Sequence, residues 1–72
     1  MDEDGALPSF CCPISSTLMV DPHINVVGQT YEKKEIELWY KQRLTDPNTN
    51  QTVSSSSLIP NHALKAVIRE WR

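Results

Sequence analysis

Cysteine is scarce in this sequence of 72 residues: Cys11 and Cys12 are the only two, and they are adjacent. Neighbouring cysteines rarely form a disulfide, because the ring they would close is strained. With only His23 and His62 beside them, they offer no Cys-x-x-Cys pair and no closely spaced histidines for a zinc cluster. We therefore expect no metal, no cofactor and no disulfide, and a reducing intracellular compartment, cytoplasmic or nuclear.

Long apolar runs and clusters of basic residues are also missing. No apolar stretch approaches the ~20 residues of a membrane-spanning helix. The start, Met1-Asp2-Glu3-Asp4, is acidic and unlike a signal or transit peptide. The net charge is −2 with both signs interspersed, so no basic stripe marks a nucleic-acid surface. We expect neither a membrane nor a nucleic acid among the partners.

A chain of this length forms one small domain with a thin core, because such a domain buries only ~60% of its unfolded surface. Residues 1–6 are expected to be a disordered tail and residues 7–72 the domain, with Leu7 and Phe10 laid against the core. Small scaffolds often depend on disulfides or metals. Since neither is expected here, hydrogen bonds from polar side chains must fix the loops.

Two segments have the turn chemistry of loops. The first, residues 13–16, contains Pro13 followed by Ile14 and two serines. The second, residues 45–57, is polar and contains Asp46-Pro47-Asn48, through which a helix cannot continue. We call them loop one and loop two. No internal repeat is visible in the sequence.

The remaining segments predict a hairpin and two helices, hence an α+β domain. Residues 22–27 are rich in β-branched side chains and end at Gly28, with Thr30-Tyr31 as the returning strand. A first helix is expected over residues 33–43, and Asn61 is expected to cap a second. The apolar stripes of these helices are Ile36, Trp39 and Tyr40 in the first, and Leu64, Val67, Ile68 and Trp71 in the second.

Several short blocks stand in an informative order. They are Cys12-Pro13-Ile14, Leu18-Met19-Val20-Asp21-Pro22, Gly28-Gln29-Thr30-Tyr31-Glu32-Lys33, Ile36, Trp39, Asp46-Pro47 and Leu58-Ile59-Pro60-Asn61. Together they resemble the U-box family of E3 ubiquitin ligases, from about Leu7 to Trp71. The resemblance implies a small RING-like fold without zinc. It also implies docking of a ubiquitin-conjugating enzyme (E2) that carries ubiquitin, and transfer of ubiquitin to a substrate lysine.

The resemblance assigns residues to the E2-binding groove: Pro13, Ile14, Ser16, Trp39, Pro47 and Asn50. Side chains near the loops form the expected polar network that replaces zinc: Ser15, Asp21, Glu32, Lys33, Thr49, Gln51 and Asn61. For these residues, three purely structural explanations remain open. Ile14 could belong to the core, Trp39 could pack beside Ile36, and the polar residues could simply be solvated.

Four positions depart from the family pattern. Lys33 stands where arginine is usual, and it lacks the planar guanidinium group of arginine. Asn50 replaces an arginine that in many relatives bridges the conjugating enzyme and ubiquitin, so one charge-assisted contact is absent. Ser16 replaces a bulkier residue. His23 replaces valine, and we expect it to be a partly buried, hydrogen-bonded strand residue.

No residue is expected to act as a catalytic nucleophile, because neither cysteine has an activating base nearby in the sequence. The main function hypothesis is therefore an E3 ligase that works by positioning the charged E2. The rival is a non-catalytic interaction module. A dimerisation unit, and hence a homodimer, is a third possibility, since the hairpin edge at residues 24–27 and Leu38 could pair with a second copy. The substrate would be recruited by other regions.

Overall fold

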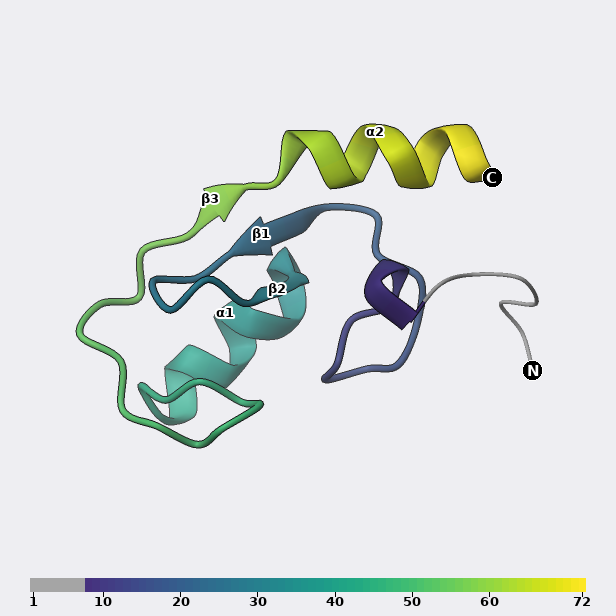
Figure 1. Ribbon diagram of the computed structural model, residues 1–72. Coiled ribbons are helices and arrows are strands. Elements are labelled where there is room, and N and C mark those ends of the chain that lie inside the picture. Colours follow the sequence, from purple (N-terminus) through teal and green to yellow (C-terminus); the bar gives the residue numbers. More distant parts are fainter. Residues whose placement is uncertain (1–7) are drawn as a thin grey trace.

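The computed structural model describes residues 8–72; the predicted tail and Leu7 lie outside them. After a 3₁₀ turn at Pro8–Phe10, the elements are β1 (Pro22–Ile24), β2 (Thr30–Glu32), α1 (Lys33–Gln42), β3 (Ile59–Pro60) and α2 (His62–Trp71). Figure 1 shows α2 along one side of β1 and α1 on the other. The predicted α+β class is confirmed, with its hairpin and two helices.

The hairpin strand β1 is shorter than predicted, because Asn25 begins the turn. The Asn25 side-chain oxygen accepts hydrogen bonds from the N–H groups of Val27 at 3.1 Å and Gln29 at 3.0 Å. Gly28 follows with φ 89°, a left-handed conformation that suits glycine. β1 and β2 then pair antiparallel, with His23 opposite Tyr31. As expected for His23, it is buried, and its Nδ1 lies 3.1 Å from the Asp21 carbonyl oxygen.

A third strand, β3, was not predicted. It pairs antiparallel with β1, Ile24 opposite Ile59, and gives the sheet the order β2-β1-β3. The edge at Ile24 that was considered for dimerisation is therefore occupied within the chain. Within this segment Ile59 is 65% exposed, whereas Leu58 packs against the core.

The two helices form close to the predicted places. α1 ends one residue early, because Arg43 takes an extended backbone with its N–H bonded to the Trp39 carbonyl oxygen at 3.0 Å. Asn61 caps α2 as predicted: its side-chain oxygen accepts from the Leu64 N–H at 3.1 Å. The Asn61 amide also donates to Thr30 Oγ1 at 3.3 Å, which ties the start of α2 to the sheet.

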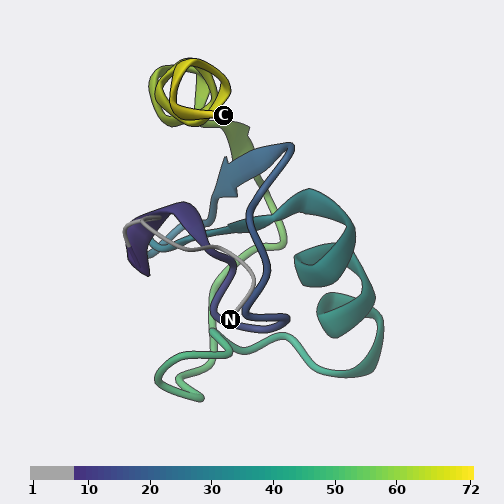
Figure 2. The same cartoon turned by 90° about the vertical axis from the view of Figure 1, so that its right-hand side faces the viewer.

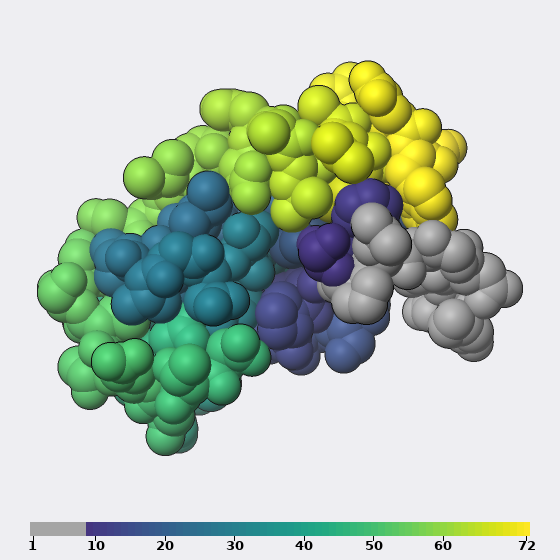
Figure 3. Space-filling view, viewed as in Figure 1, coloured from purple at the N-terminus to yellow at the C-terminus, as the bar shows by residue number. Residues whose placement is uncertain are grey.

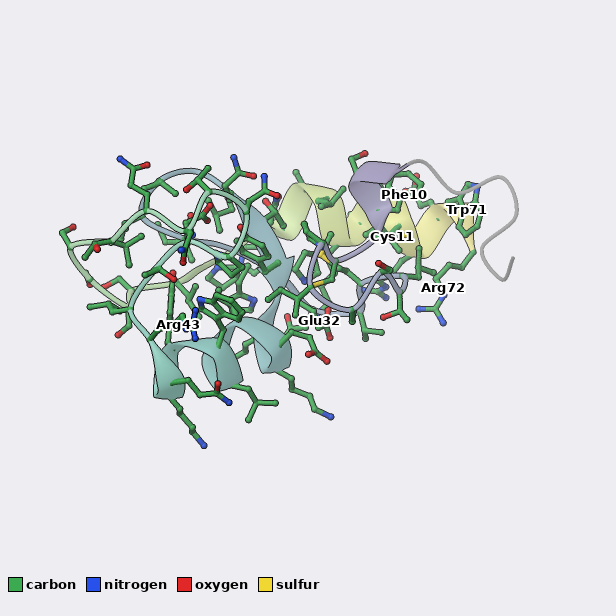
Figure 4. The ribbon with its side chains drawn as sticks, turned by 90° about the horizontal axis from the view of Figure 1, so that it is seen from below. Phe10, Cys11, Glu32, Arg43, Trp71 and Arg72 are labelled. Atoms are coloured by element: carbon green, nitrogen blue, oxygen red, sulfur yellow. The ribbon has the colours of Figure 1, made fainter. Side chains whose placement is uncertain are left out.

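The core lies between the sheet, α1 and the start of the chain. Its buried apolar residues are Phe10, Cys12, Met19, Tyr31, Ile36 and Ile68. The apolar stripe of α2 is only partly buried, which corrects the prediction for Val67 and Trp71. Trp71 is 41% exposed and meets Phe10 edge-on, with ring centroids 5.9 Å apart (Figure 4). Trp71 therefore shields one end of the core from solvent.

We predict that Ile68→Ala lowers the free energy of unfolding by about 2–5 kcal/mol, because it leaves a cavity in the core. Val67→Ala, at the exposed neighbouring position, should change it by less than about 1 kcal/mol. Urea denaturation of both variants measures the difference. Equal losses would show that α2 packs through a different face.

Candidate functional site

Loop one and loop two lie in segments that share one pattern of main-chain hydrogen bonds, residues 10–19 and 44–53. Met19 N–H donates to Phe10 O at 2.9 Å, and Val53 N–H donates to Leu44 O at 3.1 Å. Each pair is followed inward by an isolated antiparallel bridge, residue 11 with 18 and residue 45 with 52. The structure thus contains an internal repeat that the sequence does not show.

The tips of the two segments repeat as well. Cys12 N–H donates to Thr17 O at 2.9 Å, as Asp46 N–H donates to Gln51 O at 2.8 Å. The carbonyl oxygens of Cys12 and Asp46 accept from residues 16 and 50 at 2.7 and 2.6 Å. Ser16 (φ 62°) and Asn50 (φ 61°) both take the left-handed conformation that closes the turn. The two loops therefore have the same main-chain shape.

Loop two is built around the Asp46 carboxylate, which is completely buried. Its Oδ1 accepts from Tyr31 Oη at 2.7 Å and from Asn25 Nδ2 at 2.8 Å. Its Oδ2 accepts from the N–H and the hydroxyl of Thr49, at 3.1 and 3.2 Å. The Tyr31 hydroxyl in turn accepts from Asn48 N–H at 3.2 Å. One carboxylate thus joins the hairpin turn, the sheet and loop two.

The pKa values of Asp46 and Tyr31 follow from this geometry. Burial alone raises the pKa of Asp46, but the hydrogen bonds from Tyr31, Asn25 and Thr49 outweigh it and hold the pKa below its ordinary value. Burial, followed by the hydrogen bond to Asp46 and that residue's charge, raises the pKa of Tyr31 well above its usual range. At neutral pH, Asp46 is therefore an acceptor and Tyr31 a donor.

Loop one is supported differently. Glu32 Oε1, from the end of β2, accepts from the N–H groups of Val20 at 2.9 Å and Asp21 at 3.0 Å. Glu32 N–H lies 3.3 Å from the buried sulfur of Cys12 and donates to it. Cys12 occupies the place in loop one that Asp46 occupies in loop two. Its burial and its contact fit a structural role.

The other predicted network residues divide by position. Ser15 Oγ lies 2.8 Å from Thr17 Oγ1, just after loop one, and the Asp21 carbonyl oxygen accepts from Lys33 N–H at 3.1 Å. Gln51 takes part through its main chain. Among residues 8–72, the Lys33 side chain makes no hydrogen bond or ion pair, and Asn61 belongs to the α2 cap. The predicted set therefore does not form one network.

Three members of the loop-two network were missed by sequence reasoning: Asn25, Tyr31 and Asp46. Asp46 was read as turn chemistry beside Pro47, and Asn25 as part of a strand. The motifs containing Tyr31 and Asp46 were both singled out, but no local pattern shows that two segments so far apart place their side chains in contact. Only the packing of loop two against the sheet reveals it.

Trp39, the predicted groove residue of α1, is held in place beside loop two. It is half-buried and packs against the core. Its indole N–H points at Thr45, whose carbonyl oxygen and hydroxyl lie at 2.9 and 3.1 Å. The Arg43 guanidinium lies over its ring, 5.3 Å from the centroid. The ring therefore has a fixed orientation.

The remaining groove candidates lie on the two loops. Ile14 is half-buried and packs against the core, and Pro47 is half-buried. Pro13, Ser16 and Asn50 are exposed. Figure 2 shows both loops at the bottom of the molecule, away from α2, and Figure 3 shows that their surfaces adjoin. The arrangement offers two loop tips, with partly apolar residues, on one side of the domain.

Within residues 8–72, no three Cys, His, Asp or Glu side chains gather closely enough to hold a metal ion. In the same part of the chain, no helix has the length and apolar character to cross a membrane. Main-chain hydrogen bonds give both loops their shape, and the buried side chains of Cys12 and Asp46 attach them to the sheet.

A small α+β domain with two matched loops beside one helix defines a RING-like class of fold. The chain belongs to the U-box domain family, whose members are known as E3 ubiquitin ligases: a sequence model of the U-box domain matches residues 7–72.

Curated plant proteins are similar to the chain. It is 42% identical over 71 residues to U-box domain-containing protein 54 of Arabidopsis thaliana, covering 97% of this chain and 23% of that protein. It is 46% identical over 67 residues to U-box domain-containing protein 33 of the same plant, covering 92% and 8%. For U-box domain-containing protein 4 of Oryza sativa subsp. japonica the identity is 43% over 63 residues, covering 86% and 9%. The chain spans less than a quarter of each relative.

We predict that Asp46→Asn lowers the free energy of unfolding by about 2–4 kcal/mol, because a carboxamide places its own N–H₂ against two of the four donors. Asp21→Asn is the matched control. The Asp21 carboxylate is partly exposed, and its contacts with charged side chains of residues 8–72 are longer, 3.7 Å to His23 and 3.9 Å to Lys65. Urea denaturation at neutral pH should show little change for the control.

A second prediction concerns how the free energy of unfolding depends on pH in acid. A carboxyl whose pKa is lowered on folding stabilises the domain above its unfolded pKa, about 3.9, and this stability is lost as the pH falls through the folded pKa. Unfolding free energies measured from pH 7 to pH 2 should therefore drop less steeply for Asp46→Asn than for the unmodified domain. Parallel curves would show that Asp46 is not the group that titrates.

Proposed function

We propose that this domain is an E3 ubiquitin ligase module that docks a ubiquitin-charged E2 and promotes transfer of ubiquitin to a lysine. The observation that carries the proposal is Trp39, held in one orientation beside loop two, in a domain whose two loops have the same main-chain shape. Ile14 from loop one and Pro47 from loop two supply further partly apolar area. Aromatic anchors held in one orientation are typical of strong binding sites.

The proposed mechanism uses position instead of a reacting side chain. A thioester-linked ubiquitin is mobile, and holding it in one orientation lowers the entropic part of the barrier to lysine attack. Rigid loops suit this purpose, because each loop is closed by main-chain hydrogen bonds and fixed to the sheet by a buried side chain. The chemistry then belongs to the E2 and the incoming lysine.

The rival hypothesis, a non-catalytic interaction module, rests on Asn50. Its side chain is short and neutral and stands on an exposed tip. Such a domain would bind an E2 without speeding discharge. A single-turnover assay with ubiquitin-charged E2 and free lysine separates the two hypotheses, because only a ligase accelerates loss of the thioester.

We predict that Ile14→Ala reduces the rate of ubiquitin discharge at least about tenfold, because it removes apolar contact area at the tip of loop one. Part of the side chain packs against the core, so stability must be measured in parallel. Leu38→Ala is a control, since Leu38 is an aliphatic residue of α1 that is 55% exposed. Discharge that persists at the original rate in a folded Ile14→Ala domain would contradict this docking site.

Asn50→Arg should raise discharge severalfold and leave the affinity for uncharged E2 nearly unchanged. A contact made mainly in the closed, ubiquitin-loaded state raises turnover more than ground-state binding. A charge-assisted hydrogen bond contributes about 1.5–3 kcal/mol, less when exposed. Arginine tolerates φ 61° less well than asparagine, at about 1 kcal/mol of stability. Asn50→Lys tests whether a positive charge without the planar guanidinium group also raises the rate of discharge.

A further inference from the structure

The side chain of Arg43 has a defined position, although it is exposed. Its main chain is bonded to Trp39 as the cap of α1, and its guanidinium lies over the Trp39 ring. Trp39 packs against the core on one side. Because Arg43 is exposed and Trp39 only half-buried, the guanidinium covers a solvent-facing part of the indole. Figure 4 shows Arg43 at the C-terminal end of α1.

The charge of Arg43 is also unmatched within the described chain. No carboxylate of residues 8–72 forms an ion pair with it, and its N–H groups make no hydrogen bond to these residues. Stacking on an aromatic ring leaves the edges of a guanidinium free to donate. Arg43 thus presents an oriented set of donors, and the stacking has already reduced the freedom of its side chain.

We propose that Arg43 is a specificity-determining contact of the docking site, and that it pairs with a carboxylate on the surface of the docked E2. The inference rests on the proposed function. Any protein surface that covers the solvent side of Trp39 must also meet the guanidinium. Desolvating this charge without a partner is costly, so an E2 with a carboxylate opposite Arg43 is favoured over one with a lysine.

The position of Arg43 differs from that of Asn50. Asn50 is at the tip of loop two, whereas Arg43 lies over the ring of Trp39, itself a residue of the proposed groove. A cation at Arg43 therefore acts on binding of the E2 itself, with or without ubiquitin. This sets its expected effect apart from that of Asn50→Arg.

The test is a double-mutant cycle on the affinity for an uncharged E2 that supports discharge with this domain. Arg43→Gln should weaken binding about threefold to tenfold at low salt, and less at high salt. Exposed Asp and Glu residues on the docking surface of the E2 are changed one at a time to Asn and Gln. One of these changes should weaken binding similarly, and add little further loss in the Arg43→Gln background.

Lys41→Gln is the matched control, because it also removes one exposed positive charge from the last turn of α1. It should leave the affinity unchanged, and melting temperatures of both variants show whether the fold is intact. Equal affinity of Arg43→Gln and the unmodified domain, with binding still lost in Ile14→Ala, overturns the role of Arg43 and leaves the docking site standing. Additive losses for every acidic residue of the E2 also overturn it. If the unmodified domain binds no E2, the proposed function itself fails.

Discussion

The buried carboxylate of Asp46 is the interaction on which the arrangement of this domain depends. It accepts four hydrogen bonds, from the sheet, the hairpin turn and its own loop. Burying a charge is unfavourable, and only such a set of donors makes it stable. Because the donors come from separate segments, the same contact that satisfies the charge also fixes where loop two lies. Trp39 then has a fixed neighbour in Thr45 to which its indole N–H donates.

Loop one reaches the same main-chain shape with different side chains. Its buried residue is Cys12, whose sulfur accepts from Glu32 N–H, and the Glu32 carboxylate accepts from two further N–H groups. A thiol needs no compensating charge, whereas a carboxylate needs several donors. The segment of loop one is thus attached to the end of β2 through Glu32, whose partly exposed carboxylate binds the two residues that follow it, and loop two is held by a buried acid of its own. The two halves of the site are alike in backbone and unlike in electrostatics.

The sequence predicts the elements that depend on local patterns. Helical spacing, the Asn61 cap and the turn at Gly28 lead to α1, α2 and the hairpin, and short motifs lead to the family. It does not predict what depends on distant segments meeting. The two-residue strand β3 has no periodicity to detect, and the apolar spacing of Val67 and Trp71 suggests more burial than the thin core provides.

The candidate site divides in the same way. Glu32 and Thr49 were named from their place beside the loops. Thr49 donates to Asp46 in loop two, and Glu32 accepts from Val20 and Asp21, which directly follow the loop-one segment. Asn25, Tyr31 and Asp46 meet only after folding. The chain also gave no sign that residues 10–19 and 44–53 have one shape, because main-chain hydrogen bonds leave little trace in residue types.

The repeated loop frame has a consequence for how such a domain diversifies. Its defining bonds join main-chain atoms, so the exposed side chains at the tips are not needed to hold the loop shape, although the half-buried Ile14 also packs against the core. A lineage can exchange those tip residues freely and acquire new partners while its scaffold persists. The left-handed positions, Ser16 and Asn50, are the exception, since bulky or β-branched residues are disfavoured there. Exchange is therefore easy at the exposed tip positions, whereas at positions 16 and 50 it is limited to residues that tolerate a left-handed backbone.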